Sequence, residues 1–216
     1  MEIKSIGQAR YFLLFVDDAS RMSSVYFLKE KNQALQYFKE YKRLVENQTG
    51  NKIKVLRTDN GGEFCSKEME NYLKSEGIVH QKTNPYTPEQ NGLSERLNRT
   101  LVERAKCLLF EAKLGKQFWA EAVNTAAYLR NRSPASGLGN MTPFEKWTGR
   151  KPDLSQVRVF GSSVMVHVPK EKRLKWDKKA VKYILVGYPD NIKGYRLYNL
   201  DTKQITMSRD VTILEK

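Results

Sequence analysis

Two carboxylates stand in settings where they could bind metal ions. Asp59 ends an apolar-alternating run and begins Asp59-Asn60-Gly61-Gly62, which is typical of a strand followed by a glycine-rich turn. Glu95 comes after the turn-rich segment 84–92, at the start of a helix predicted for about 90–112. Carboxylates on rigid elements hold two divalent cations about 4 Å apart in enzymes that transfer phosphoryl groups. The pair therefore suggests an enzyme that cuts or joins nucleic acid.

Each carboxylate also has a plain structural interpretation. Asp-Asn-Gly-Gly after a strand is a common turn, and a lone Asp there is more often a turn former than a metal ligand. Glu95 and Arg99 are spaced i, i+4, which suits an ordinary surface ion pair worth a few tenths of a kcal/mol. The metal interpretation rests on the two carboxylates occurring together within longer motifs. Glu63, close to Asp59, is interpreted as structural.

The positive charge lies mainly in the second half of the chain. The formal net charge is +14, with 18 Lys/Arg against 15 Asp/Glu in residues 1–112 and 20 against 9 in residues 113–216. A basic stripe favours approach to a phosphate backbone through counterion release, although it could also be a solvated loop. Beside the carboxylate pair we favour nucleic acid. The excess is densest at Lys170, Lys172, Arg173, Lys175, Lys178, Lys179 and Lys182.

Composition excludes several classes of protein. The chain has 216 residues, 40% of them hydrophobic, which is enough for a medium domain and a small one. The sequence contains no run of about 18 apolar residues, so no membrane span is predicted. The two cysteines and two histidines lack the spacing of a structural zinc site. Unpaired thiols favour a reducing compartment.

Hydrophobic periodicity predicts an α/β part followed by an all-β part. Strands are expected at 11–16, 24–28, 52–57 and 78–80, with helices at 31–47, 66–75, 90–112 and 116–131. Residues 133–140 are expected to be a linker, and Thr142 to cap a short helix that ends before Gly149. Strands are then expected at 157–168, 181–187, 194–199 and 203–208. Such short strands suggest a small SH3-like barrel lined by Tyr183, Tyr188, Tyr195 and Tyr198.

Longer motifs around both carboxylates resemble a known family. Thr58-Asp59-Asn60-Gly61-Gly62-Glu63-Phe64 and Tyr86-Thr87-Pro88-Glu89-Gln90-Asn91-Gly92-Leu93-Ser94-Glu95-Arg96 resemble the second and third catalytic segments of copia-type retrotransposon integrases. Gly149-Arg150-Lys151-Pro152-Asp153, Val159-Phe160-Gly161, Val186-Gly187-Tyr188 and Lys193-Gly194-Tyr195-Arg196-Leu197 resemble the β module that follows that core. The resemblance covers nearly the whole chain.

The resemblance implies a fold and a domain plan. The fold class is α/β, an RNase H-like mixed sheet with flanking helices, followed by a small all-β SH3-like barrel. The expected domains are an integrase core at 1–132, a linker with a short helix at 133–156 and the SH3-like domain at 157–216. In the family the first catalytic Asp precedes the segment that begins here at Met1, so we expect the chain to lack it and to be N-terminally truncated. Asp17 and Asp18 are poor candidates to replace it.

The implied activity is DNA integration, by 3′-end processing and strand transfer. Asp59 would bridge the metal ions and Glu95 would hold one of them, with Mg²⁺ as cofactor and Mn²⁺ able to substitute in vitro. Arg96 and Arg99 could position phosphates, and Asn60 and Gly61 could let the backbone approach DNA. The expected partner is DNA, a homo-oligomer is a further candidate, and no membrane is expected. The expected location is the nucleus, or a cytoplasmic particle before nuclear entry.

Two rival functions stay open. The chain could be a degenerate or domesticated copy that binds nucleic acid without catalysis, which the missing Asp would favour. It could also be an RNase H-like nuclease acting on RNA:DNA hybrids, which the basic β module argues against.

Overall fold

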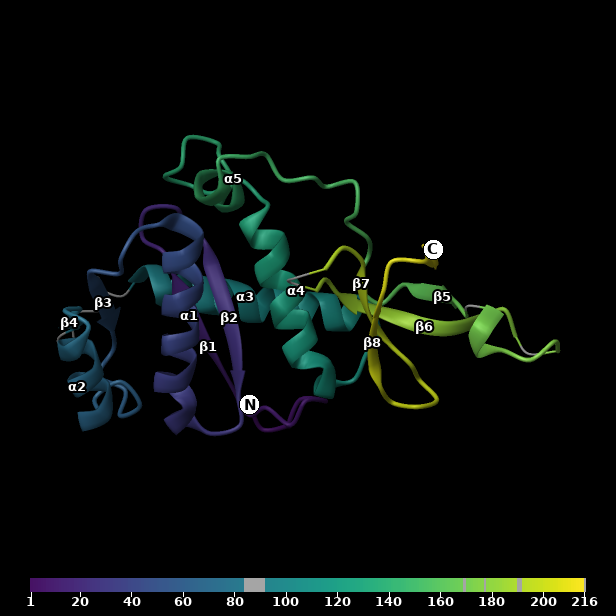
Figure 1. Cartoon of the computed structure of the whole chain (residues 1–216), viewed down its shortest axis with the longest axis horizontal. Helices are drawn as coiled ribbons and strands as arrows, with labels where there is room; N and C mark the ends of the chain where they lie inside the picture. The colour runs from purple at the N-terminus through teal and green to yellow at the C-terminus, as the bar shows by residue number, and fades with distance from the viewer. Residues whose placement is uncertain (84–91, 169, 177, 190–191, 216) are drawn as a thin grey trace. The chain divides into compact units, whose positions relative to one another are not determined.

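The computed structural model describes residues 1–83, 92–168, 170–176, 178–189 and 192–215 (Figure 1). The chain divides into two compact units. The first comprises Met1–Phe15 and Val25–Thr100, and the second comprises Val16–Ser24 and Leu101–Lys216. The predicted domain boundaries at 132 and 157 stay predictions. No helix in the described part is long and apolar enough to cross a membrane.

The first strands of the chain form an antiparallel pair. β1 (Tyr11–Val16) and β2 (Ser23–Leu28) form a two-stranded sheet. Backbone bonds from Arg10 N to Leu28 O, 2.8 Å, and from Asp17 N to Met22 O, 2.9 Å, tie its two ends. These bonds confirm the predicted hairpin.

A helix covers this hairpin with aromatic side chains. The 3-10 turn η1 (Lys31–Gln33) leads into α1 (Ala34–Thr49), which ends at Gly50 in the left-handed conformation, φ +70°. The Phe15 ring stacks on Tyr41 at 4.5 Å between centroids and meets Phe38 at 5.9 Å. Aromatic burial of this kind is among the largest contributions a small core can make.

A parallel strand pair carries the first candidate carboxylate. β3 (Val55–Thr58) pairs with β4 (Val79–Lys82) in parallel register, from Val55 opposite Val79 to Thr58 opposite Lys82. The crossover contains α2 (Lys67–Ser75), whose Ser66 cap accepts a hydrogen bond from Met69 N. Parallel pairing requires such a crossover. Asp59 directly follows the carboxyl end of β3. The parallel β3–β4 pair and the antiparallel β1–β2 hairpin, with their helices, confirm the predicted mixed α/β core.

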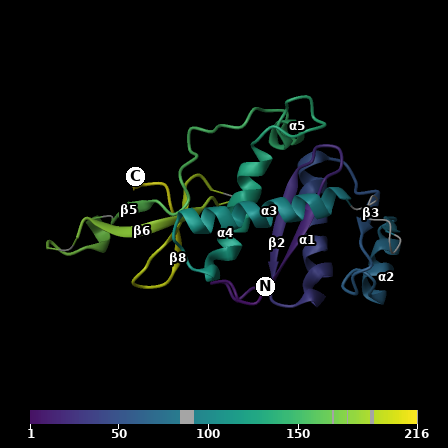
Figure 2. The same cartoon turned by 180° about the vertical axis from the view of Figure 1, so that it is seen from behind.

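A long helix carries the second candidate carboxylate. α3 (Gly92–Glu111) is one continuous helix (Figure 2). Leu97, Leu101 and Ala105 of its predicted apolar stripe are buried. The predicted start near residue 90 lies outside the described residues.

The second unit is centred on a helix that is buried almost all round. η3 (Lys116–Phe118) precedes α4 (Trp119–Asn131), in which Glu121, Thr125 and Asn131 are buried together with the apolar residues. These polar groups are satisfied by hydrogen bonds, for example from Ser23 N and Oγ to Asn131 Oδ1. α5 (Pro143–Thr148) follows, capped by Thr142 and ended by Gly149 as predicted.

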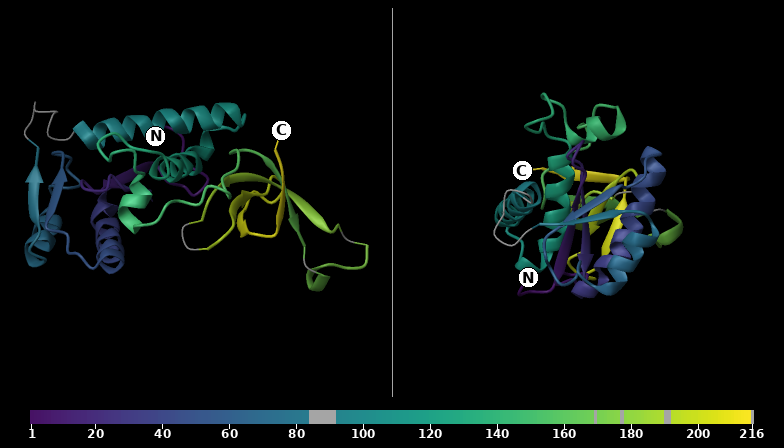
Figure 3. Two further views of the ribbon diagram at one scale, coloured as in Figure 1. Left: turned by 90° about the horizontal axis from the view of Figure 1, so that it is seen from above. Right: turned by 90° about the vertical axis from the view of Figure 1, so that its left-hand side faces the viewer.

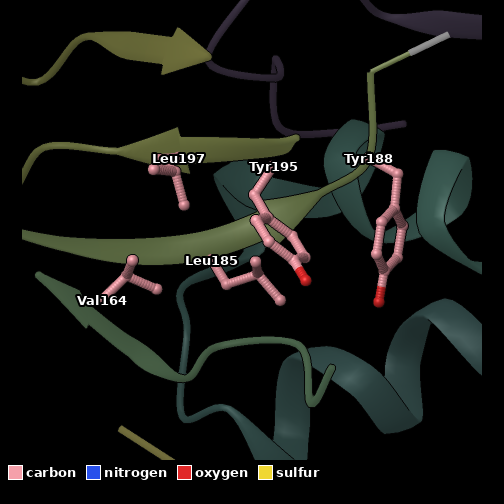
Figure 4. Packing of buried hydrophobic residues seen from close by; sticks show 5 residues of the cluster. All are labelled: Val164, Leu185, Tyr188, Tyr195 and Leu197. Atoms are coloured by element: carbon pink, nitrogen blue, oxygen red, sulfur yellow. The ribbon is translucent and has the colours of Figure 1, made fainter. Parts of the chain in front are cut away.

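The C-terminal part is a five-stranded antiparallel sheet in the order β8-β7-β6-β5-β9. Its core contains Val164, Leu185, Tyr188, Tyr195 and Leu197 (Figure 4). This sheet confirms the predicted SH3-like region. The strands are β5 (Ser163–His167), β6 (Ala180–Gly187), β7 (Tyr195–Tyr198), β8 (Ile205–Ser208) and β9 (Val211–Leu214).

Two strand predictions in this part were wrong. The strand expected at 157–168 begins only at Ser163, because Gly161 has φ +86° and Ser162 N bonds back to Val159 O in a turn. The strand β9 was not predicted at all, although it closes the sheet by pairing with β5. Hydrophobic alternation predicted strands in this region but did not predict the turn at Gly161.

Candidate metal and nucleic-acid site

Asp59 lies in a turn directly after β3. Its Oδ1 accepts the Gly61 N–H at 3.0 Å, which is the turn-forming role that the sequence also suggested. Asp59 is exposed and belongs to no ion pair among the described residues. The turn therefore orients the carboxylate through its Oδ1 oxygen.

Gly61 allows this arrangement because it has no side chain. A Cβ at this position would lie 2.9 Å from Asp59 Oδ1 and 3.2 Å from Glu63 Oε2. Glu63 itself approaches Lys31 Nζ at 3.8 Å, which supports its structural interpretation. The glycine thus lets two carboxylates come close to one backbone segment.

Asn60 ties this turn to the neighbouring strand. Its Nδ2 donates to Thr83 O at 2.9 Å, just beyond the end of β4. The bond uses the amide donor for structure, and Asn60 as a whole is exposed. Contact between Asn60 and nucleic acid stays a prediction.

His80 and Lys82 stand next to the turn and were not singled out from the sequence. Thr58 Oγ1 lies 2.9 Å from His80 Nε2, and the buried His80 Nδ1 has no partner in the described part of the chain. Burial, together with the nearby Lys82 charge, lowers the pKa of His80. Lys82 Nζ pairs with Glu70 at 2.6 Å. Only the register of β3 against β4 could have brought these groups to notice.

An open hollow lies along this strand pair. Its walls include Arg57, His80, Gln81, Lys82 and Thr83. Arg57 reaches across to Gln81 Oε1 through Nε, 3.3 Å, and Nη2, 3.2 Å. Arg57 and Lys82 therefore place two cationic side chains along the strand pair that precedes Asp59. Such charges would attract a phosphate.

Glu95 lies in the first turn of α3 and is exposed. No ion pair joins it to Arg99 among the residues that the structure describes, so the surface-pair interpretation is not realised. Arg96 and Arg99 are exposed on the same helix. Asp59 and Glu95 belong to one compact unit, whereas most of the predicted loop before Glu95, residues 84–91, lies outside the described residues.

A third carboxylate is not gathered with these two. Within the described residues, no group of three His, Cys, Asp or Glu side chains could hold a metal ion. Asp17 Oδ2 accepts hydrogen bonds from Ser20 N and Oγ at 2.7 and 2.6 Å, and Asp18 pairs with Arg21. Both aspartates are therefore used in the hairpin turn.

The predicted basic cluster lies in the connection between β5 and β6, which is called the basic loop here (residues 168–180). Lys170, Lys175, Lys178 and Lys179 are exposed, and Arg173 is half-buried. The side chain of Lys172 lies outside the described part. Lys182 belongs to β6 and is therefore not part of the basic loop.

Comparison with known proteins places these features in a family. The integrase core domain model matches residues 1–88, and the retroviral polymerase SH3-like domain model matches residues 162–216. The chain is 49% identical over 215 residues to the retrovirus-related Pol polyprotein from transposon TNT 1-94 of Nicotiana tabacum, covering 100% of this chain and 16% of that polyprotein. It is 36% identical over 214 residues to the Pol polyprotein from transposon RE2 of Arabidopsis thaliana, covering 99% and 15%.

A solved structure has the same fold. The match is a chain of the simian T-cell lymphotropic virus intasome in complex with the PP2A regulatory subunit B56 gamma, with a TM-score of 0.54 and 16% identity, covering 92% of this chain and 69% of that one. The present chain spans about a sixth of the length of the curated relatives it matches. The chain therefore contains an integrase core domain followed by a retroviral SH3-like domain, and it is similar to the retrovirus-related Pol polyproteins of plant retrotransposons.

Proposed function

We propose that this chain acts in DNA integration, with Asp59 and Glu95 as two of the carboxylates that bind divalent metal during 3′-end processing and strand transfer. The observation that carries the proposal is the state of the two side chains. Both are exposed at the ends of rigid elements of one unit, and neither is neutralised by an ion pair among the described residues. Such carboxylates keep their charge for a hard cation.

The donor set fits Mg²⁺, or Mn²⁺ in vitro, because both ions prefer carboxylate oxygens. When bound, the metal would supply Lewis-acid stabilisation and an activated nucleophile for attack on a phosphodiester. Asp59 would bind through Oδ2, since Oδ1 is held by Gly61 N–H. Glu95 would bind from the first turn of α3, and the exposed Arg96 and Arg99 would orient phosphates.

Partners and location follow from the same proposal. DNA would be bound mainly through its backbone, because strand transfer into target DNA needs little base readout. Further copies of the chain would assemble on the DNA ends. The reaction would take place in the nucleus, after passage through a cytoplasmic particle.

A non-catalytic role is the second candidate. It is favoured by one observation, that the described residues contain no cluster of three metal-binding side chains. In that case the chain would bind nucleic acid through its basic surface and would leave catalysis to another polypeptide. Loss of the two carboxylates would then leave its binding to DNA unchanged.

Strand transfer by the 216-residue chain on a DNA-end substrate with Mn²⁺ separates the two candidates. The variants Asp59→Asn and Glu95→Gln remove the metal ligands with little change in shape, and Glu103→Gln alters another exposed carboxylate of α3 as a matched control. We expect both ligand variants to lose about 100-fold or more in rate and the control to keep it.

Metal binding gives a second readout that needs no catalysis. Titration of Mn²⁺ followed by electron paramagnetic resonance should show binding that is lost in Asp59→Asn and Glu95→Gln. If the unmodified chain transfers no strands but retains DNA binding, the chain is either the non-catalytic form or a fragment that lacks the first catalytic Asp, and Mn²⁺ binding by Asp59 and Glu95 would support the fragment. Mn²⁺ affinity equal in all variants would rule out the two carboxylates as ligands.

A further inference from the structure

Trp176 is exposed over 93% of its surface in the basic loop. Trp119, in contrast, is 6% exposed and belongs to the core of the second unit. An indole ring gains more from burial than almost any other side chain, so its exposure is costly unless it meets a partner. The described part of the fold leaves this ring uncovered, so it is available to a partner.

The loop holds the ring away from the sheet. The β5–β6 ladder closes at His167 opposite Ala180, and Val168 N bonds Lys179 O at 3.0 Å. The described residues between them, including the short 3-10 turn η4 (Lys170–Lys172), extend beyond the strand ends (Figure 3, left). These backbone hydrogen bonds close the base of the basic loop.

The surroundings of the ring are strongly cationic. Lys175, Lys178 and Lys179 are exposed, and none of them belongs to an ion pair among the described residues. Residues 168–180 contain six Lys/Arg and two acidic residues. An aromatic face set among unpaired cations matches a ligand with a charged backbone and flat bases.

We infer that Trp176 stacks on an unpaired base of DNA whose phosphates are held by Lys175, Lys178 and Lys179. The inference rests on the proposed DNA substrate, but it requires no metal ion and no catalysis. Stacking is open to an indole because every base presents a π-face, whereas the bases of an intact duplex are already stacked on one another. Trp176 would therefore add affinity for single-stranded or frayed DNA over intact duplex.

An anionic membrane is the rival occupant of such a surface. Membrane binding by this route needs the apolar face of an amphipathic helix, which inserts over its whole length. The described helical part of the loop is the three-residue η4, and its exposed apolar neighbours are limited to Leu174 and Trp176. The loop is thus better suited to a nucleic acid than to a lipid surface.

Fluorescence anisotropy tests the inference with a labelled oligothymidine strand and a labelled blunt-ended duplex of two annealed strands, both in EDTA. We expect Trp176→Ala to weaken single-strand binding by about 5- to 150-fold and duplex binding by less. Trp176→Phe should keep most of the affinity because it retains an aromatic face. Phe110→Ala, at another exposed aromatic residue, should change nothing, and thermal unfolding should be unaltered in all three.

Salt dependence separates stacking from charge. Trp176→Ala should leave the slope of log affinity against log salt unchanged, whereas Lys178→Ala should reduce its magnitude by about 0.7 on the single strand. Emission of Trp176, taken as the difference between the unmodified chain and Trp176→Phe, should be quenched by the oligothymidine strand.

Three outcomes would overturn the inference. They are equal single-strand affinity of the unmodified chain and Trp176→Ala, an equal loss on both DNA substrates, and quenching by phosphatidylserine vesicles but not by the strand. If strand transfer is absent from the unmodified chain while Trp176→Ala still loses single-strand affinity, the proposed chemistry fails and the stacking site stands.

Discussion

Arg196 on β7 and Glu121 on α4 form a bidentate ion pair across 75 residues of sequence. Arg196 Nε donates to Glu121 Oε2 at 2.6 Å, and Nη2 donates to Oε1 at 3.0 Å. The side chains are 28% and 11% exposed. Because the planar guanidinium matches a carboxylate through two parallel bonds, this pair sets the orientation of α4 against the β sheet within the second unit.

Arg196→Lys should destabilise the chain although it keeps the charge. An ammonium cannot make both bonds, so the free energy of unfolding should fall by about 1–3 kcal/mol in urea titration. Arg209→Lys is the matched control, because Arg209 is 79% exposed in a 3.8 Å pair with Asp210. Equal stability of the two variants would show that the pair does not hold the sheet to α4.

Gly161→Ala should destabilise the same unit by a clash. A Cβ there would lie 2.3 Å from Ala112 Cβ and 3.0 Å from Ala112 Cα. Gly137→Ala is matched for backbone strain, since φ is +87° there against +86° at Gly161, but nothing lies within 4 Å of its Cβ. We expect Gly161→Ala to lose about 1–3 kcal/mol more than Gly137→Ala in urea unfolding. Similar losses would mean that the backbone at Ala112 moves aside without cost.

Acid should weaken the first unit through Glu46. Burial opposes its ionisation, but hydrogen bonds from Ile53 N, Lys42 and Lys52 outweigh burial and lower the pKa of Glu46 from 4.5 to about 2. Because the folded pKa lies below the unfolded one, this contribution is present above pH 4.5 and is lost as the pH falls toward 2. The unfolding temperature should therefore drop across that window.

Glu46→Gln should remove this pH dependence. Its unfolding temperature should be about 3–8 °C lower than that of the unmodified chain at pH 7, and the difference should shrink as the pH falls toward 2. Glu40→Gln, at an exposed position of the same helix, should follow the unmodified chain. A constant difference between Glu46→Gln and the unmodified chain from pH 7 to pH 2 would refute the prediction.

Gly61→Ala should impair the proposed metal site without unfolding the chain. The added Cβ would displace Asp59 Oδ1, 2.9 Å away, and a side-chain end can move at little cost in stability. Displaced ligands act through geometry, so strand transfer should fall by about 10-fold. Gly62→Ala is the control, since nothing lies within 4 Å of its Cβ. Equal activities would show that the Asp59 position is not critical.

Helix ends could be predicted closely from the sequence because their signals are local. Ser66 and Thr142 cap α2 and α5 through bonds to Met69 N and Glu145 N, three residues away in each case. Gly50 ends α1 in the left-handed conformation, as glycine does in most such positions. A cap needs only its own turn, so tertiary contacts do not have to be known.

Strands of the β module were predicted less well. The run 157–168 alternates as a strand does, yet a turn at Gly161 occupies its first half. β9 (Val-Thr-Ile-Leu) pairs with the edge of β5, and this pairing was not predicted although its residues favour a strand. Strand pairing is non-local, so a single segment does not contain the information that decides it.

The sequence by itself determined the family motifs, the carboxylates Asp59 and Glu95, and the position of the basic loop. Only the tertiary structure decided which groups meet: Arg196 with Glu121, His80 with Thr58, and the Asp59 carboxylate with Gly61 N–H. It also revealed that Trp176 is left uncovered. The physical reason is that residue type sets the chemistry available at a position, whereas burial and partnership depend on segments that folding brings from far along the chain.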